Sequence, residues 1–329
     1  MSDRPRLVVV APAYEESAGI ESFVGEVARV ARAELAGYRT TLVVVDDGSR
    51  DDTYARLRQA ATRLEDVELL AIRLSRNFGQ QAALHAGLET AHERFADAAM
   101  FVIMDADLQH PPSLLPRIVQ RLAAGVHHVK LVRKGSGAPG FLKRATSALF
   151  YRLFSSMSEI SVPPGSSDFR GLSPRFVAAY LELSERGRFN RGLFHWLGFA
   201  EESVPYDAPD RPYGATKYSF VRMARLALVG LTQFSSKPLL VTLLGTVGFS
   251  AIFCTAYLVF ELVRWLHGTQ FVVGWPTIVF FVSFWGGLLA LGQLMIGVYV
   301  ARIFDEVKAR PIYVVEEVCS PTVPPRPTA

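Results

Sequence analysis

Short apolar runs alternate with longer and more polar stretches in the N-terminal part of the chain. The runs have the length of strands and are rich in valine, isoleucine or leucine; they are Leu7–Ala11, Thr41–Val45, Val67–Ile72, Ala99–Met104 and His128–Val132. Such runs are typical of strands that are covered on both faces. The stretches between them predict helices over Gly19–Leu35, Asp52–Leu64, Gln80–Ala91 and Ser113–Ala124.

This alternation predicts an α/β fold with a mostly parallel sheet and helices on both of its faces. Asp51 or Asp52 is expected to cap the second helix, and Ser113 the fourth. In sheets of this kind ligands bind beyond the carboxyl ends of the strands, so we expect the functional residues there.

Two long apolar stretches follow in the C-terminal part of the chain. Pro238–Val263 contains a single acidic residue, Glu261, and Val272–Val300 contains no charged residue. Each stretch exceeds the roughly 20 apolar residues that a helix needs to cross a bilayer. A buried core helix is the alternative, but two adjacent stretches of this length favour membrane spans.

Basic residues gather beside these spans. They are Lys217, Arg222, Arg225 and Lys237 before the first span, and Arg302, Lys308 and Arg310 after the second. The connecting segment RWLHGTQF carries one firm positive charge, Arg264. The positive-inside rule therefore predicts that the N-terminal domain and the C-terminus are cytoplasmic. The net charge of +4, placed beside the spans, suits a membrane surface better than nucleic acid.

The sequence thus predicts a multi-pass protein of the inner (plasma) membrane with four parts. These are a cytoplasmic N-terminal domain (1–212), juxtamembrane amphipathic helices (213–237), two membrane helices (about 238–263 and 272–300) and a cytoplasmic C-terminal tail (301–329). The opening RPRLVVVAPAY has too short an apolar run for a secretory signal, and the final CSPTVPPRPTA has the composition of a disordered tail.

Acidic residues follow three of the expected strands, in the strings PAYEE, DDGS and DADLQ. Asp46 and Asp47 could be turn residues before Gly48, but acids at three strand ends favour a ligand site. Asp105 and Asp107 repel each other unless a cation lies between them. Carboxylates without histidine or cysteine partners suit Mg²⁺ or Mn²⁺, which also bind phosphate oxygens, and Gln109 offers a further oxygen. The alternative is a solvated acidic loop, because Asp-x-Asp alone is a weak signal.

Taken together, these strings resemble the family 2 glycosyltransferases with the GT-A fold. The resemblance is carried in order by VVVAPAYEE, VVVDDGSRDDT, LSRNFGQQAALHAGL, DADLQHPP, VRKGSG, LKRATSALFYRLF, SSDFRGLS, RFNRGLFHWLGF, DRPYGATKYSF and the paired spans. Within this family the chain most resembles the polyprenyl-phosphate glycosyltransferases, which include dolichol-phosphate mannose synthases and bactoprenol glucosyltransferases. The Gln-x-x-Arg-Trp string that a processive synthase of this superfamily would carry is absent from the sequence.

The resemblance implies roles for particular residues on the donor side. It assigns the nucleotide base and ribose to Pro12, Tyr14, Glu16, Asp46 and Asp47, with a weaker assignment of Arg76 to the donor site. It assigns metal and diphosphate binding to Asp105, Asp107 and Gln109. His110, in the same string, is given no catalytic role.

On the acceptor side the resemblance implies a lipid phosphate. It assigns phosphate contacts to Arg133, Arg144 and Ser147, and a mobile acceptor loop to Arg211 and Lys217, where an ordinary juxtamembrane helix is the alternative. Asp168, in SSDFRG, matches the proposed general base of the bactoprenol branch, although the same string could cap a turn or pair with Arg170.

The implied reaction is attack of a polyprenyl-phosphate oxygen on the anomeric carbon of a UDP- or GDP-hexose, with inversion. Because the two-span architecture resembles that of the bactoprenol glucosyltransferases, the resemblance makes glucose from UDP-glucose and undecaprenyl phosphate the first choice, and leaves GDP-mannose and UDP-N-acetylhexosamine open. The product would be a lipid-linked sugar for a separate flippase, and the bactoprenol branch suggests a homotetramer. Two alternatives stay open: a glycolipid synthase acting on a diacylglycerol-type alcohol, and a non-catalytic nucleotide-binding membrane scaffold.

Overall fold

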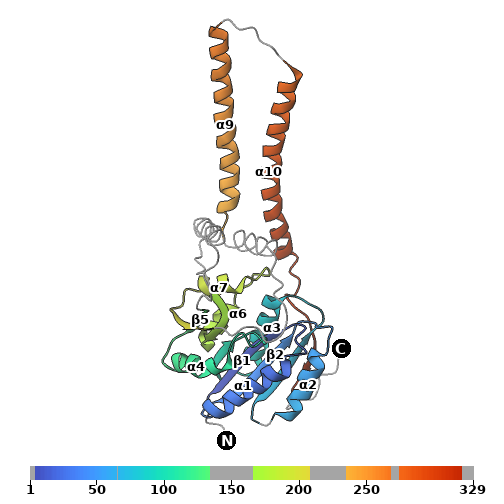
Figure 1. Ribbon diagram of the computed structural model, residues 1–329, viewed down its shortest axis with the longest axis vertical. Coiled ribbons are helices and arrows are strands. Elements are labelled where there is room, and N and C mark those ends of the chain that lie inside the picture. Colours follow the sequence, from blue (N-terminus) through green and yellow to red (C-terminus); the bar gives the residue numbers. More distant parts are fainter. Residues whose placement is uncertain (1–3, 65, 134–165, 208–234, 268–273, 321–329) are drawn as a thin grey trace. The chain divides into compact units, whose positions relative to one another are not determined.

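The computed structural model describes residues 4–64, 66–133, 166–207, 235–267 and 274–320 (Figure 1). Within them one eight-stranded sheet has the strand order β7-β5-β6-β4-β1-β2-β3-β8. Its strands are β1 (Arg6–Ala13), β2 (Arg39–Asp46), β3 (Glu68–Leu74), β4 (Ala98–Ile103), β5 (His128–Arg133), β6 (Ser166–Leu172), β7 (Glu201–Tyr206) and β8 (Val315–Cys319). Four of the seven strand pairings are parallel, which confirms the predicted mostly parallel α/β sheet.

Helices cover both faces of this sheet. They are α1 (Ile20–Glu34), α2 (Thr53–Arg63), α3 (Gln80–Arg94), the 3-10 turn η1 (Pro112–Leu114), α4 (Leu115–Ala123), α6 (Pro174–Leu181) and α7 (Asn190–Trp196). Leu7 and Val9 of β1 belong to the core formed with α1, α2 and α4, whereas Val10 points to the other face, where it meets α3. At Gly87 of α3 a Cβ would lie 2.5 Å from a Val10 methyl, so glycine lets this helix lie close against the sheet.

All five predicted strands and all four predicted helices are found near the expected positions. The predicted cap of the fourth helix is wrong, because Ser113 lies inside η1 and α4 begins only at Leu115. For the second helix, Asp52 occupies the N-cap position without a side-chain bond, and Asp51 accepts the Thr53 N–H at 3.1 Å instead.

The C-terminal segment is more than a tail. Val315–Cys319 forms β8, which pairs antiparallel with β3 in the register Ala71 with Cys319 and Leu74 with Val315. The Ser75 N–H also donates to the Val314 carbonyl at 2.9 Å. The expectation of a tail over residues 301–329 is therefore corrected for these residues, which complete the edge of the sheet.

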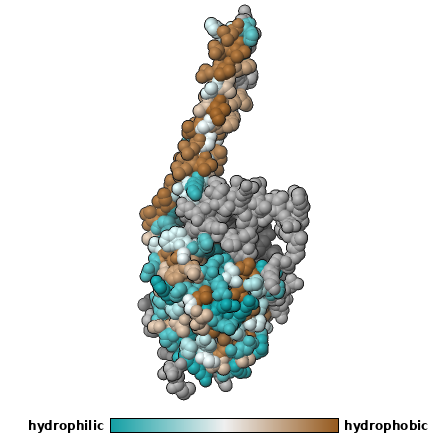
Figure 2. All heavy atoms as spheres, turned by 90° about the vertical axis from the view of Figure 1, so that its left-hand side faces the viewer, coloured by the Kyte–Doolittle hydropathy of each residue, from teal (hydrophilic) through white to brown (hydrophobic). Residues whose placement is uncertain are grey.

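A second compact unit contains helices α9 (Lys237–Leu266) and α10 (Trp275–Val307). Both are long and apolar enough to cross a membrane, with mean hydropathies of 2.0 and 1.9 over their most apolar windows. None of the first window and 6% of the second is buried, whereas the core helix of a soluble protein is mostly buried. Figure 2 shows hydrophobic side chains along these helices. An exposed apolar surface of this extent fits lipid.

Candidate active site

A cavity of about 370 Å³ opens at the carboxyl ends of β1, β2 and β4, where the sequence predicts the ligand site. It combines acidic side chains with backbone and small polar groups from four loops. Its lining consists of Pro12, Ala13, Tyr14, Glu16, Asp47, Asn77, Gly79, Gln80, Asp105, Ala106 and Asp107. The three acidic strings of the sequence therefore do meet around one cavity. A volume of this size is ordinary for a small-molecule site.

Asp47 organises the loop opposite to it. Its two carboxylate oxygens accept the backbone N–H groups of Phe78 and Gly79, at 2.7 and 2.8 Å. These residues lie just before and at the N-cap of α3, so the carboxylate stands where the helix dipole favours negative charge. Burial raises the pKa of Asp47, and the two N–H bonds offset part of that rise.

Asp46 is fully buried behind the cavity and is not part of its lining. Its Oδ1 accepts the Ser49 N–H at 3.2 Å, and its Oδ2 lies 3.9 Å from the Nε of Arg73. Burial raises its pKa, and the bonds from Ser49 and the charge of Arg73 pull the pKa down.

The loop after β4 presents two carboxylates to the cavity. Asp105 accepts a hydrogen bond from the Gln80 side chain at 2.8 Å, and Asp107 accepts the Gln109 N–H at 3.0 Å. Leu108, which follows Asp107, has a φ of 60°, a left-handed conformation that costs a non-glycine residue energy and is found at ligand loops.

His110 supports this loop from beneath. Its Nδ1 accepts the Asp105 N–H at 2.8 Å, and its ring stacks on Phe169 at 5.0 Å between centroids. Burial lowers the pKa of His110 to about 4, so the ring is neutral and accepts this bond at neutral pH. His110 thus ties the loop to β6.

The donor set of this loop fits a hard divalent cation. Asp105 and Asp107 supply two carboxylates to the cavity, and oxygen is the ligand atom that Mg²⁺ and Mn²⁺ prefer. Among the described residues no group of three or more histidine, cysteine, aspartate or glutamate side chains could hold a metal by itself. Such an ion would therefore need oxygens from a bound diphosphate or water as well.

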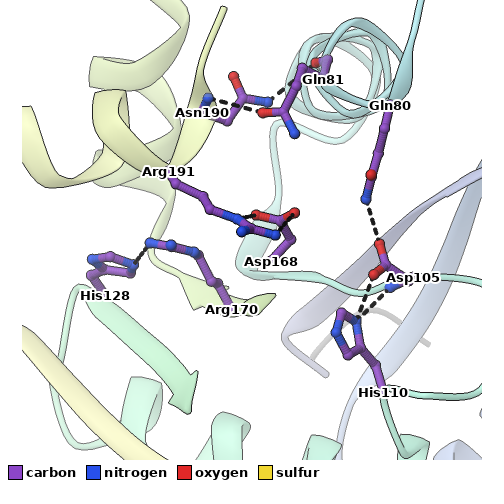
Figure 3. A network of polar contacts seen from close by, with 9 residues as sticks. All are labelled: Gln80, Gln81, Asp105, His110, His128, Asp168, Arg170, Asn190 and Arg191. Atoms are coloured by element: carbon purple, nitrogen blue, oxygen red, sulfur yellow. Dashed lines mark hydrogen bonds and ion pairs between the residues drawn. The ribbon is translucent and has the colours of Figure 1, made fainter. Parts of the chain in front are cut away.

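Asp168 on β6 forms a two-pronged ion pair with Arg191 of α7 (Figure 3). The Nε of Arg191 lies 2.7 Å from Oδ1 and a terminal nitrogen lies 2.8 Å from Oδ2. Burial acts to raise the pKa of Asp168, but the hydrogen bonds and charge of Arg191, helped by Arg170, hold this pKa below its usual value. The carboxylate is therefore ionised and already engaged at neutral pH.

Some predicted site residues do not line the cavity. Arg76 packs its guanidinium 4.2 Å from the Phe78 ring centroid, and Gln109 and Arg133 lie outside the lining. Arg144, Ser147, Arg211 and Lys217 lie outside the described residues.

The sequence reasoning missed Asn77, Gln80 and Arg191. All three occur in strings that carry the family resemblance, SRNFGQQ and RFNRGLF, so the strings themselves were the available signal. Their neighbours Gln81 and Asn190 were missed as well, although they join α3 to α7.

Residues 8–178 match the family model described as Glycosyl transferase family 2. This match, the mostly parallel sheet and its helices on both faces agree with the predicted GT-A-like fold.

Relatives of known name cover nearly the whole chain. An uncharacterized glycosyltransferase, YkcC of Bacillus subtilis (strain 168), is 33% identical over 96% of this chain and 95% of its own. The SfII prophage-derived bactoprenol glucosyl transferase of Shigella flexneri is 31% identical over 95% of this chain and 98% of its own. Among solved structures, the mannosyltransferase PcManGT of Pyrobaculum calidifontis, in complex with GDP-Man and Mn²⁺, is 18% identical with a TM-score of 0.49, over 94% of this chain and 86% of that one. This last likeness is too distant to carry an argument.

Proposed function

The chain belongs to glycosyl transferase family 2, and from that membership we propose that it transfers a hexose from a nucleotide sugar to a polyprenyl phosphate at a membrane surface. The proposed donor is UDP-glucose and the proposed acceptor is undecaprenyl phosphate. Near-full-length similarity to bactoprenol glucosyl transferases supports this choice, because it includes the two apolar helices as well as the sheet.

The observation that carries the acceptor class is the ion pair between Asp168 and Arg191. A sugar or lipid hydroxyl needs a base to remove its proton, and a carboxylate with a lowered pKa that already binds an arginine is a poor base. A phosphate oxygen is ionised at neutral pH and needs no such base. The pair therefore favours a phosphate acceptor over a diacylglycerol-type alcohol.

The donor would occupy the cavity at the strand ends. Tyr14, Glu16 and Asp47 line its nucleotide side in this proposal, and Asp46 lies behind them. Asp47 also accepts hydrogen bonds from the backbone N–H groups of Phe78 and Gly79, which hold that loop in place. Mg²⁺ or Mn²⁺, held by Asp105, Asp107 and Gln109, would supply positive charge against the departing diphosphate.

The acceptor phosphate would approach from the side of Asp168. Arg133, at the end of β5, belongs to this side in the proposal. So do Arg144, Ser147, Arg211 and Lys217, which lie outside the described residues. One displacement without a covalent intermediate would invert the anomeric centre.

The test uses full-length protein in detergent with Mn²⁺, undecaprenyl phosphate and radiolabelled UDP-glucose, GDP-mannose and UDP-N-acetylglucosamine. Label extracted into organic solvent reports lipid-linked sugar. We expect label from UDP-glucose, its loss with a chelator, and a loss of roughly 10²-fold or more in Asp107→Asn, the scale seen when one electrostatic contact is removed from an active site.

Asp66→Asn is the matched control, because Asp66 is an exposed acid paired with Arg32 on the domain surface. Its activity should equal that of the wild type. Label from a different donor would correct the sugar. Transfer to diacylglycerol but not to undecaprenyl phosphate would overturn the acceptor, and no transfer to either by folded, nucleotide-binding protein would favour a scaffold.

A further inference from the structure

Arg191 is held in one orientation by the residues around it. Asp168 engages the Nε side of its guanidinium through two hydrogen bonds of 2.7 and 2.8 Å. Asp168 itself is 95% buried, and 38% of the Arg191 side chain is exposed. A buried carboxylate thus fixes a partly exposed cation, which is how a protein prepares an arginine for an anionic ligand.

The backbone that carries Arg191 is fixed as well. Asn190, the preceding residue, receives a bond from Tyr180 at 2.9 Å, donates its backbone N–H to the Gln81 side chain at 2.9 Å, and donates its side chain to the Gln81 carbonyl at 3.2 Å. Asn190 is fully buried. The start of α7 is therefore bound to the first turn of α3.

The same turn of α3 also holds the acidic loop. Gln80, the neighbour of Gln81, donates to Asp105 at 2.8 Å (Figure 3). Two consecutive glutamines therefore link Asp105 on one side to Asn190 and Arg191 on the other. This arrangement sets the distance between the proposed leaving-group loop and the arginine, which a reaction between two bound substrates requires.

Two arginines act on the charge of Asp168, and Glu201 acts in turn on one of them, Arg170. Arg170 is buried two residues along β6, and burial lowers its pKa only to about 10, so it keeps its charge at neutral pH. One carboxylate therefore faces two guanidinium groups. Of the two arginines around Asp168, Arg191 is partly exposed, so its positive charge is available to an anionic ligand.

We propose that Arg191 binds the phosphate of the polyprenyl phosphate acceptor, and that Asp168 is the positioning residue that holds this arginine rather than the general base. The inference rests on the proposed function and deepens it. In the reaction an ionised phosphate oxygen forms the new bond to the anomeric carbon. The bond from that carbon to the diphosphate oxygen breaks, its electron pair leaves with the nucleoside diphosphate, and no proton is transferred to Asp168.

The test measures steady-state kinetics of the full chain in detergent, with UDP-glucose and undecaprenyl phosphate varied in turn. Arg191→Gln should raise the KM for undecaprenyl phosphate by about 10- to 100-fold, the loss expected for a charge-assisted hydrogen bond, and leave the KM for the donor within about twofold. Arg191→Lys should recover part of the loss, because it keeps the charge without the planar fork.

Asp168→Asn should change the same constant in the same direction, by less than Arg191→Gln, because asparagine can still accept one bond from the arginine. Its pH profile for kcat should keep the acid limb of the wild type. Arg175→Gln is the control, since Arg175 is an exposed arginine that packs on Phe199 in the same part of the fold. Calorimetric measurement of UDP binding shows whether each variant is folded. If Arg191→Gln does not fold, Arg191→Lys takes its place in the test.

A hundredfold fall of kcat in Asp168→Asn with an unchanged acceptor KM and a lost acid limb would make Asp168 the base and overturn the proposal. If the wild type transfers sugar and both Arg191 variants keep its acceptor KM, the proposed role of Arg191 is overturned but the proposed function stands. If the wild type transfers sugar to no polyprenyl phosphate, the proposed function fails and the inference fails with it.

Discussion

At the scale of single residues, Gly48 shows how closely two loops of the site are packed. It has a φ of +65°, and a Cβ at this position would lie 2.6 Å from the Cα of Arg76 and 2.7 Å from the amide nitrogen of Asn77. These are backbone atoms, which cannot move aside as a flexible side chain can. Glycine therefore lets the DDGS turn touch the loop that Asp47 binds.

Gly48→Ala should separate these two loops. The positive φ alone costs about 1 kcal/mol for alanine, and the collision with backbone adds to it, so we expect roughly 2–4 kcal/mol of lost stability. Affinity for UDP should fall more than tenfold, because Asn77 and Gly79 line the cavity. Thermal unfolding and calorimetry of UDP binding measure the two effects.

Gly125→Ala is the matched control. Gly125 also has a positive φ, +92°, but a Cβ there meets nothing within 4 Å, and the residue follows α4 away from the cavity. This variant should lose stability by the strain alone and bind UDP normally. Equal loss of UDP affinity in both variants would contradict the idea that the contact between the two loops matters.

Some residues of the site could be predicted from the sequence and others could not, for a physical reason. The acids at the ends of β1, β2 and β4 were predictable because parallel strands bring their carboxyl ends to one edge. Arg191 was not, because its partner Asp168 lies on a different element and an ion pair leaves no periodic pattern in the sequence. The same holds for the bonds of Gln80 and Gln81, which join α3 to the loop after β4 and to α7.

At the scale of elements, β8 is the clearest departure from expectation. Its sequence VEEVC is short, has two central acids and follows a long apolar helix, so it lacks the signal of a buried strand. The interactions that stabilise it come from β3 and α2, far away in the chain. Arg73 of β3 lies 3.4 Å from Glu316, and Arg58 of α2 lies 3.6 Å from Glu317. The long apolar-periodic elements, in contrast, were found where predicted.

Removal of residues 311–329 should destabilise the domain and weaken donor binding. It exposes the edge of β3 and removes the Val314 carbonyl that accepts the Ser75 N–H, at the start of the loop that leads to Gly79. We expect the unfolding temperature to fall by about 4 °C or more and the donor KM to rise severalfold. Thermal unfolding and steady-state kinetics in detergent check both values.

A shorter deletion, of residues 321–329, is the control for this prediction. It keeps the whole of β8 and all its pairings with β3. The unfolding temperature and the donor KM should stay at wild-type values. If the two deletions behave alike, β8 does not support the domain in the way its pairing indicates.

At the scale of the whole molecule, the pairing of β3 with β8 constrains membrane topology. The chain leaves the sheet after β7, forms α9 and α10, and returns to the same sheet as β8. Both ends of the helical pair are thereby tied to one domain. If α9 crosses a bilayer, α10 must cross it back. This argument uses hydrogen-bonded strands and is independent of the positive-inside rule, which predicts the cytoplasm as the side of the domain.

Cysteine labelling of intact cells tests this topology. In a background with Cys254→Ser and Cys319→Ser, a membrane-impermeant maleimide should label His267→Cys, at the end of α9, without lysis. It should label Arg94→Cys, at the end of α3, and Lys308→Cys, just after α10, only once the cells are opened. The latter two positions serve as controls for each other, because the β3–β8 pairing requires them to lie on one side. External labelling of both, with His267→Cys protected, would reverse the orientation and place the donor cavity away from the cytoplasmic pool of nucleotide sugars. Labelling of Lys308→Cys without Arg94→Cys would contradict the sheet itself, since one strand cannot pair with another across a bilayer.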